Sequence, residues 1–228
     1  MTLALALRVA LRREGVLHFL GYPQDREPPA HTAALLETVL DEARRLVEAR
    51  GAYRRLPAER SRDVGLDLVP AEGLVVGLVT AGPALEARAS ECLRAGDATS
   101  ALLFDAAGSA AAEEAADRLG AVIVAELSGR NPALAAREAE QPGATAPISC
   151  RISPGHGSWK LGAQEALFSL LPAAEVGVAL APSLLMEPRK SLSFAMWLGA
   201  DARPIAGLSG CARCGLPHCP YRKEPLRG

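Results

Sequence analysis

The sequence predicts a mixed α/β protein in which helices pack against a sheet. Of its 228 residues, 49% are hydrophobic but only 4% are aromatic, so small aliphatic side chains must fill the core. Apolar residues recur at helical spacing from Thr32 to Arg50, which predicts an amphipathic helix. An apolar, β-branched run from Leu74 to Thr80, bounded by glycines, predicts a buried strand.

Further elements before residue 97 follow from local patterns. Gly51 supplies an end for the helix over 32–50, whereas residues 53–69 are polar and broken and predict no regular element. The remaining segments are a partly alternating strand over 3–9, an amphipathic segment over 12–20 and a helix over 83–95 that begins near Pro83.

After residue 97 the chain is rich in alanine and then in turns. Residues 98–105 predict a strand or a buried helical turn, and 108–120 predict a closely packed helix with 122–127 as its candidate continuation. The turn-rich stretch 129–147 predicts a boundary or a long loop. A helix over 161–171 and strands over 176–181 and 191–198 follow. We expect one unit over 1–228, with two lobes (1–147 and 148–210) and a cysteine-rich tail over 211–222.

The charge balance argues against two classes of partner. Twenty-five Lys and Arg against 26 Asp and Glu give a net charge of −1, so neither nucleic acid nor an anionic membrane surface is the expected partner. No stretch approaches the roughly 20 apolar residues of a membrane span. The apolar start carries its arginines after the apolar run and shows no cleavage pattern, which is atypical of a secretory signal. We therefore expect a cytoplasmic protein.

Three of the five cysteines fall within nine residues near the end of the sequence. Cys211 and Cys214 are separated by two residues, Cys219 follows, and His218 lies beside it. This spacing suits a metal site, either zinc held by the three thiolates and the imidazole or an iron–sulfur cluster held by the cysteines alone. The alternative is three reduced cysteines in a tail.

A second candidate site is the turn from Arg151 to Gly157. Its glycines let a ligand approach the backbone, and the Arg151 guanidinium can hold a carboxylate bidentately, which fits an amino-acid-like ligand. Gly155 and His156 complete this candidate site, with His156 as a ligand or a proton carrier. The alternative is a solvated arginine beside an ordinary loop.

The segment from Met186 to Ser193 is the third candidate. It places two cations and the hydroxyls of Ser191 and Ser193 before an apolar strand, an arrangement that could recognise phosphate groups or a polar cofactor edge. The alternative is the beginning of a strand with solvated charges. Glycine-rich phosphate loops, a nucleophile-elbow serine and a zinc-protease helix are all missing from the sequence, which argues against dinucleotide enzymes and the common hydrolases.

Taken in order, several short motifs resemble the activation domain of cobalamin-dependent methionine synthase, in particular its short stand-alone relatives. The resemblance covers most of the chain. The motifs are Gly21-Tyr22, the stretch from Leu103 to Ser109, Ala116-Asp117-Arg118-Leu119, the turn from Arg151 to His156, the segment from Met186 to Ser193, and the cysteines ending in Cys219-Pro220-Tyr221-Arg222.

The resemblance implies a curved, largely antiparallel sheet with packed helices and a site for S-adenosylmethionine. In that family the domain restores oxidised cobalamin by coupling one-electron reduction to methylation, and Arg151 and Gly155 match the turn that contacts the methyl donor. His156 stands where the family has an aromatic residue. The cobalamin itself would come from a partner, and the electron from a separate donor.

We therefore expect an accessory protein for reductive methylation of cobalamin in methionine synthase, without a complete reaction of its own. The alternative is an electron-transfer module, bearing a metal or an iron–sulfur cluster, that serves another corrinoid protein. A third interpretation is a domain that caps a corrinoid protein without chemistry.

Overall fold

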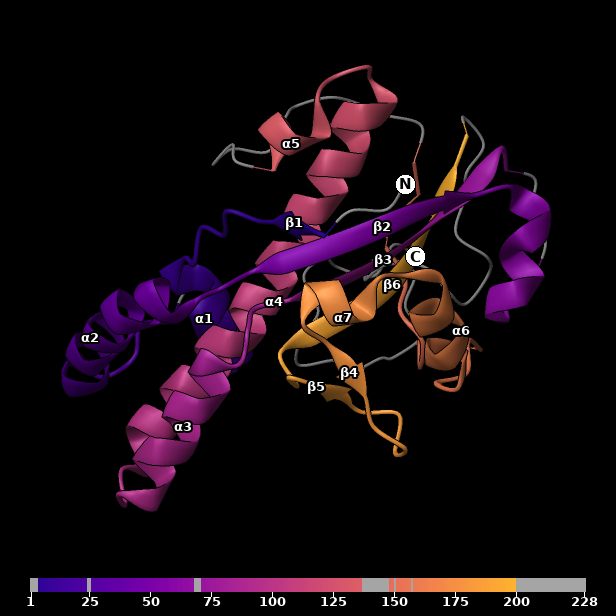
Figure 1. Ribbon diagram of the computed structural model, residues 1–228. Helices are drawn as coiled ribbons and strands as arrows, with labels where there is room; N and C mark the ends of the chain where they lie inside the picture. Colours follow the sequence, from indigo (N-terminus) through magenta and orange to yellow (C-terminus); the bar gives the residue numbers. More distant parts are fainter. Residues whose placement is uncertain are drawn as a thin grey trace.

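The computed structural model describes residues 4–23, 26–67, 71–136, 148–149, 151–156 and 158–199. These residues form a mixed α/β fold built around a four-stranded antiparallel sheet, with the strand order β1-β2-β3-β6 (Figure 1). The strands are β1 (Leu5–Ala6), β2 (Arg50–Leu56), β3 (Gly73–Thr80) and β6 (Ser191–Leu198). A separate hairpin pairs β4 (Ala179–Leu180) with β5 (Met186–Glu187). The predicted fold class, an antiparallel sheet with packed helices, is confirmed.

One long helix covers one face of the sheet. Helix α4 (Ala98–Leu127) has 30 residues, and its second half packs on β3 and β6 through alanines and branched aliphatic side chains. Its first half packs in a second cluster with α1 (Arg13–Phe19), α2 (Ala30–Leu46) and α3 (Ala84–Arg94). In Figure 1, α4 runs from α3 at one end to α5 (Pro132–Ala135) at the other. The small alanine side chains allow this close packing.

The opposite face of the sheet is covered by short elements. These are the 3₁₀ helix η1 (Ala58–Val64), α6 (Ala163–Leu170) and α7 (Ala173–Val176). Their apolar side chains share a core cluster with Leu74, Val76 and Leu78 of β3 and with Ala195 and Trp197 of β6. Alternation along each strand thus sends one set of side chains to α4 and the other set to α6 and η1.

Three sequence predictions of elements need correction. The helix expected over 32–50 ends at Leu46, and Gly51, expected as its stop, lies inside β2. Strand β2 itself was missed because three exposed arginines, Arg50, Arg54 and Arg55, hide its alternation. Of the two alternatives for residues 98–105, the strand is wrong and the helical one agrees with the structure, but these residues open the single helix α4 instead of forming one turn.

The other predicted elements are of the expected type, but their ends are shifted. The strand over 74–80, the helix beginning near Pro83, the helix over 161–171 and the strand over 191–198 correspond to β3, α3, α6 and β6. The strand expected over 3–9 shortens to β1, and the one over 176–181 to β4 after α7. Strand β6, from the second predicted lobe, pairs with β3 along its whole length. The residues around the predicted boundary at 137–147 lie outside the described ones.

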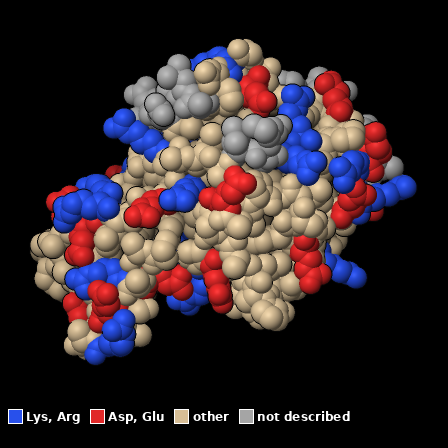
Figure 2. Space-filling model, in the orientation of Figure 1, with Lys and Arg blue, Asp and Glu red and all other residues tan. Residues whose placement is uncertain are grey.

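Charges of both signs are mixed over the surface in Figure 2, and no single-sign area dominates that face. Within the described ranges, no helix combines the length and the apolar composition that a membrane crossing requires.

Candidate functional site

Arg151 lies at the outer edge of the sheet, beside β6. Ile152 and Ala195 exchange backbone hydrogen bonds, with N···O distances of 3.0 and 2.8 Å, and Ser149 N–H donates to the Trp197 carbonyl at 2.9 Å. Ser149 and Ile152 therefore bond to the outer edge of β6 on either side of Arg151. Because Ile152 joins the cluster under α6, the neighbouring Arg151 side chain points to the α4 face.

Two carboxylates of α4 hold the Arg151 guanidinium. Its Nη1 donates to Asp117 at 2.7 Å, and its Nη2 donates to Glu113 at 2.6 Å. Glu113 and Asp117 are four residues apart, so they project from the same side of the helix. The side chains of Arg151, Glu113 and Asp117 are 20%, 28% and 37% exposed, which leaves the cluster within reach of a dissolved ligand.

The Arg151 guanidinium lies over a buried aromatic ring. The Arg151 Cζ lies 5.7 Å from the ring centroid of Phe194 in β6, within the range of a cation–π contact. Phe194 faces Gly77 of β3 across the ladder. A Cβ atom at Gly77 would lie 2.4 Å from Phe194 Cζ, so the ring occupies space that only glycine leaves free.

The turn that follows Arg151 is exposed at its tip and anchored at its base. Gly155 has a φ of +92°, a conformation that favours glycine, and both Gly155 and His156 are exposed. Gly155 N–H donates to the Trp159 carbonyl at 2.7 Å. The buried Trp159 indole N–H donates to the Val64 carbonyl at 2.8 Å, which ties the turn to η1. The backbone at Gly155 is thus open to a ligand while its base is fixed.

Both cations of the Met186–Ser193 segment are neutralised within the chain. Arg189 pairs with Glu86 of α3, and the Lys190 Nζ lies 2.7 Å from Asp105 and 3.0 Å from the Ser109 hydroxyl of α4. A Cβ at Gly108 would lie 2.9 Å from Lys190 Cγ, so this glycine leaves room for the lysine stem. Each of these cations therefore has a partner within the chain, as Arg151 does, and recognition of phosphate stays a prediction.

Ser191 and Ser193 lie on the other face of the sheet from Arg151. Both are buried, and they alternate with Leu192 and Phe194, whose side chains face α4. The Ser191 hydroxyl lies 2.7 Å from the Pro188 carbonyl and 2.9 Å from the Thr80 hydroxyl. The structure therefore brings Arg151, Gly155 and His156 together in one segment and separates them from the two serines. A ligand contact by these serines stays a prediction.

The cysteine cluster lies outside the described residues, as do Cys211, Cys214, His218 and Cys219 individually. Among the residues that the structure does describe, no group of three or more His, Cys, Asp or Glu side chains is arranged to hold a metal ion. The predicted metal site stays a prediction.

Sequence reasoning missed Glu113, Asp117 and Phe194 as neighbours of Arg151. The available signal was the spacing of Asp105, Ser109, Glu113 and Asp117, four residues apart along a helix rich in alanine. That spacing predicts one polar stripe. It does not tell which part of the chain the stripe faces.

Comparison with solved structures shows a likeness of fold. No protein-family model matches the chain, and no curated protein sequence matches it. A crystal structure of the MetH reactivation domain bound to AdoHcy superposes with a TM-score of 0.62. The match covers 88% of this chain and 79% of that one, at 16% sequence identity. At this identity the likeness shows a shared fold.

Proposed function

We propose that this chain is an accessory protein for reactivating cobalamin in a B12-dependent methionine synthase. The observation that carries the proposal is the fold it shares, over 88% of its length, with a reactivation domain of MetH. The short motifs that occur in the same order along the chain as in the activation-domain family support the same role. The partner would be the cytoplasmic enzyme that holds the cobalamin, with the electron supplied by a separate donor.

S-adenosylmethionine is the ligand we propose for the Arg151 segment. The crystal structure with the same fold contains AdoHcy, which differs from S-adenosylmethionine by the absence of the sulfonium methyl group. Arg151 supplies a partly exposed guanidinium for a ligand carboxylate, and Gly155 supplies exposed backbone four residues later. These groups fit the amino-acid end of such a ligand, with His156 beside it. When bound, S-adenosylmethionine supplies a methyl group activated by the sulfonium.

The chain's own residues would bind and orient the methyl donor. Phe194 lies within cation–π range of the guanidinium, and the Trp159 anchor holds the turn, so the ligand would meet a preformed surface. Because the cobalamin belongs to the partner, we expect no complete reaction from this chain alone.

A second candidate function is electron delivery to a corrinoid protein. The spacing of Cys211, Cys214 and Cys219 favours it, because three thiolates can hold an iron–sulfur cluster. In that case the tail would carry the reducing electron. Zinc in the same residues would instead have a structural role.

One titration tests the proposal. Anaerobically purified protein is titrated calorimetrically with S-adenosylmethionine, and iron and zinc are quantified on the same sample. We expect micromolar binding, and Arg151→Ala should weaken it by about 1.5–3 kcal/mol, as for a charge-assisted hydrogen bond. Absence of binding together with stoichiometric iron would favour the second function.

A cysteine variant serves as the control for the metal. Cys214→Ser should release the metal while leaving the calorimetric signal for S-adenosylmethionine in place. Full metal content in Cys214→Ser would show that the predicted cluster is wrong.

A further inference from the structure

The Arg151 guanidinium already donates to carboxylates of its own chain. Its Nη1 donates to Asp117 at 2.7 Å and its Nη2 donates to Glu113 at 2.6 Å, so both terminal nitrogens have an acceptor before any ligand binds. Bidentate binding of a carboxylate uses two N–H groups on one edge of the guanidinium, and each such edge includes a terminal nitrogen. A ligand carboxylate must therefore share these nitrogens with the two acidic side chains or displace one of them.

Asp117 is the carboxylate that a ligand can displace more readily. Its side chain is 37% exposed, and Arg151 is its only ion-pair partner among the described residues. Glu113 is 28% exposed and has a further interaction besides its pair with Arg151. If Asp117 turns away from Arg151, its carboxylate meets water at the surface of α4 and stays solvated. The pair between Asp117 and Arg151 can thus open without burying a charge.

Other contacts hold the arginine when this pair opens. Ser149 and Ile152, on either side of Arg151, are hydrogen-bonded to β6. The guanidinium lies 5.7 Å from the ring centroid of Phe194. Neither contact involves Asp117, so we expect the guanidinium to stay in place when Asp117 turns away. Loss of the Asp117 carboxylate should therefore free a donor without moving it.

We propose that Asp117 is an autoinhibitory residue that competes with the ligand carboxylate for Arg151. The site then has a closed form, with Asp117 on Arg151, and an open form that binds the ligand. The apparent affinity is the affinity of the open form multiplied by the fraction of molecules in that form. This inference rests on the proposed function, because it concerns access to the site where S-adenosylmethionine would bind. It gives Asp117 a role that the resemblance to the activation domain does not assign.

Calorimetric titration of the full chain with S-adenosylmethionine measures the competition. We expect Asp117→Asn and Asp117→Ser each to bind about threefold or more tightly than the unaltered protein, because a neutral side chain competes less for the guanidinium. Asp105→Asn is the matched control, because it removes a carboxylate from the same stripe of α4 that pairs with Lys190 instead of Arg151. It should bind like the unaltered protein. Equal or weaker binding by both Asp117 variants would overturn the inference.

A second measurement needs no ligand. Phenylglyoxal modifies arginine side chains, and mass spectrometry of the digested protein locates the modified residue. Arg151 should react about threefold or more faster in Asp117→Asn than in the unaltered protein, because the open form is more populated. The exposed Arg50 is the internal reference and should react equally in both proteins.

The two measurements separate this inference from the proposed function. Faster modification of Arg151 in Asp117→Asn, without binding of S-adenosylmethionine by any variant, would remove the proposed function and support control of Arg151 by Asp117. An unchanged rate at Arg151 would overturn the inference, whatever the titration gives. Tighter binding together with faster modification would support both.

Discussion

At the scale of single residues, the candidate site depends on Gly77, because a residue with a side chain at this position would collide with Phe194. Gly77 of β3 leaves space for the ring of Phe194, and that ring supports the Arg151 guanidinium. A β-carbon at Gly77 would fall within 3 Å of three ring atoms. Because Phe194 is fully buried, the ring cannot move without displacing its neighbours.

We predict that Gly77→Ala destabilises the protein by about 1–3 kcal/mol, as expected for overpacking of a core. The shifted ring should also weaken ligand binding at Arg151. The control is Gly120→Ala in α4, where a β-carbon meets nothing within 4 Å. It should stabilise by about 0.4–1 kcal/mol through the unfolded chain. Urea unfolding measures both changes, and equal stabilities of the two variants would contradict this account.

At the scale of elements, the turn after Arg151 is held by one tryptophan. The Trp159 side chain is 2% exposed, and its indole N–H donates to the Val64 carbonyl at the end of η1. The Trp159 carbonyl in turn accepts from Gly155 N–H. The candidate ligand segment is thereby connected to η1, whose Val64 lies 95 residues before Trp159, in addition to its bonds with β6.

We predict that Trp159→Phe costs about 1–3 kcal/mol beyond the loss of ring volume, because a buried carbonyl loses its donor. Trp197→Phe is the matched control. Trp197 is equally buried, but its indole N–H has no hydrogen-bond partner among the described residues, so only ring volume is lost. Thermal unfolding of both variants gives the difference. A Trp197→Phe variant that is the less stable of the two would refute the anchoring role of Trp159.

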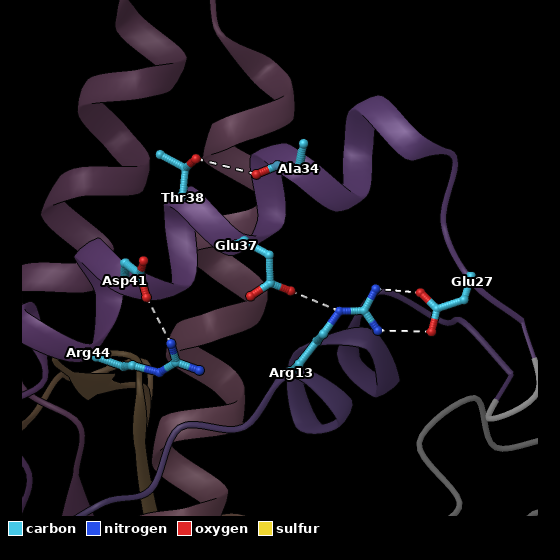
Figure 3. A network of polar contacts seen from close by, with 7 residues as sticks. All are labelled: Arg13, Glu27, Ala34, Glu37, Thr38, Asp41 and Arg44. Carbon is cyan, nitrogen blue, oxygen red and sulfur yellow. Dashed lines mark hydrogen bonds and ion pairs between the residues drawn. The ribbon is translucent and has the colours of Figure 1, made fainter.

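At the scale of the whole molecule, exposed ion pairs join separate segments. Figure 3 shows Arg13 of α1 between Glu27, which precedes α2, and Glu37 within α2. The hydrogen bonds from Arg13 lower the pKa of Glu27. At the beginning of α4, the hydrogen bonds from Ser100 lower the pKa of Asp97, whose carboxylate accepts from Ser100 N–H at 2.9 Å.

Both shifts have the same consequence for stability against pH. A carboxyl group whose pKa is lower in the folded state contributes stability above its unfolded pKa and loses that contribution as the pH falls through its folded pKa. We therefore predict that the free energy of unfolding decreases below about pH 4, the range of unfolded carboxyl groups. The double variant Glu27→Gln, Asp97→Asn should show a shallower decrease. Urea titrations at pH 7, 4 and 3 measure it, and an unchanged slope would exclude these two groups as contributors.

Much of the fold could be predicted from local patterns. The strand over 74–80 is buried on both faces, so it appears in the sequence as a continuous apolar run. The helix beginning near Pro83 buries one face, so its apolar residues recur at helical spacing. Strand β2 leaves no such trace, because its exposed arginines interrupt the alternation although the strand lies between β1 and β3 in the sheet. Helix α4 was divided in the prediction because alanine and glycine fit several environments, and only its packing against two clusters shows that it is continuous.

The sequence by itself determined the fold class, the position of Arg151 before a glycine-bearing turn, and the resemblance that suggests cobalamin reactivation. These features follow from composition, local conformational preference and the order of short motifs. Only the tertiary structure decided that Arg151 meets Glu113 and Asp117, that Lys190 is neutralised by Asp105, and that Ser191 lies on the opposite face. Charge pairs between distant segments depend on sheet register and helix rotation, and neither quantity is encoded in the local sequence around the paired residues.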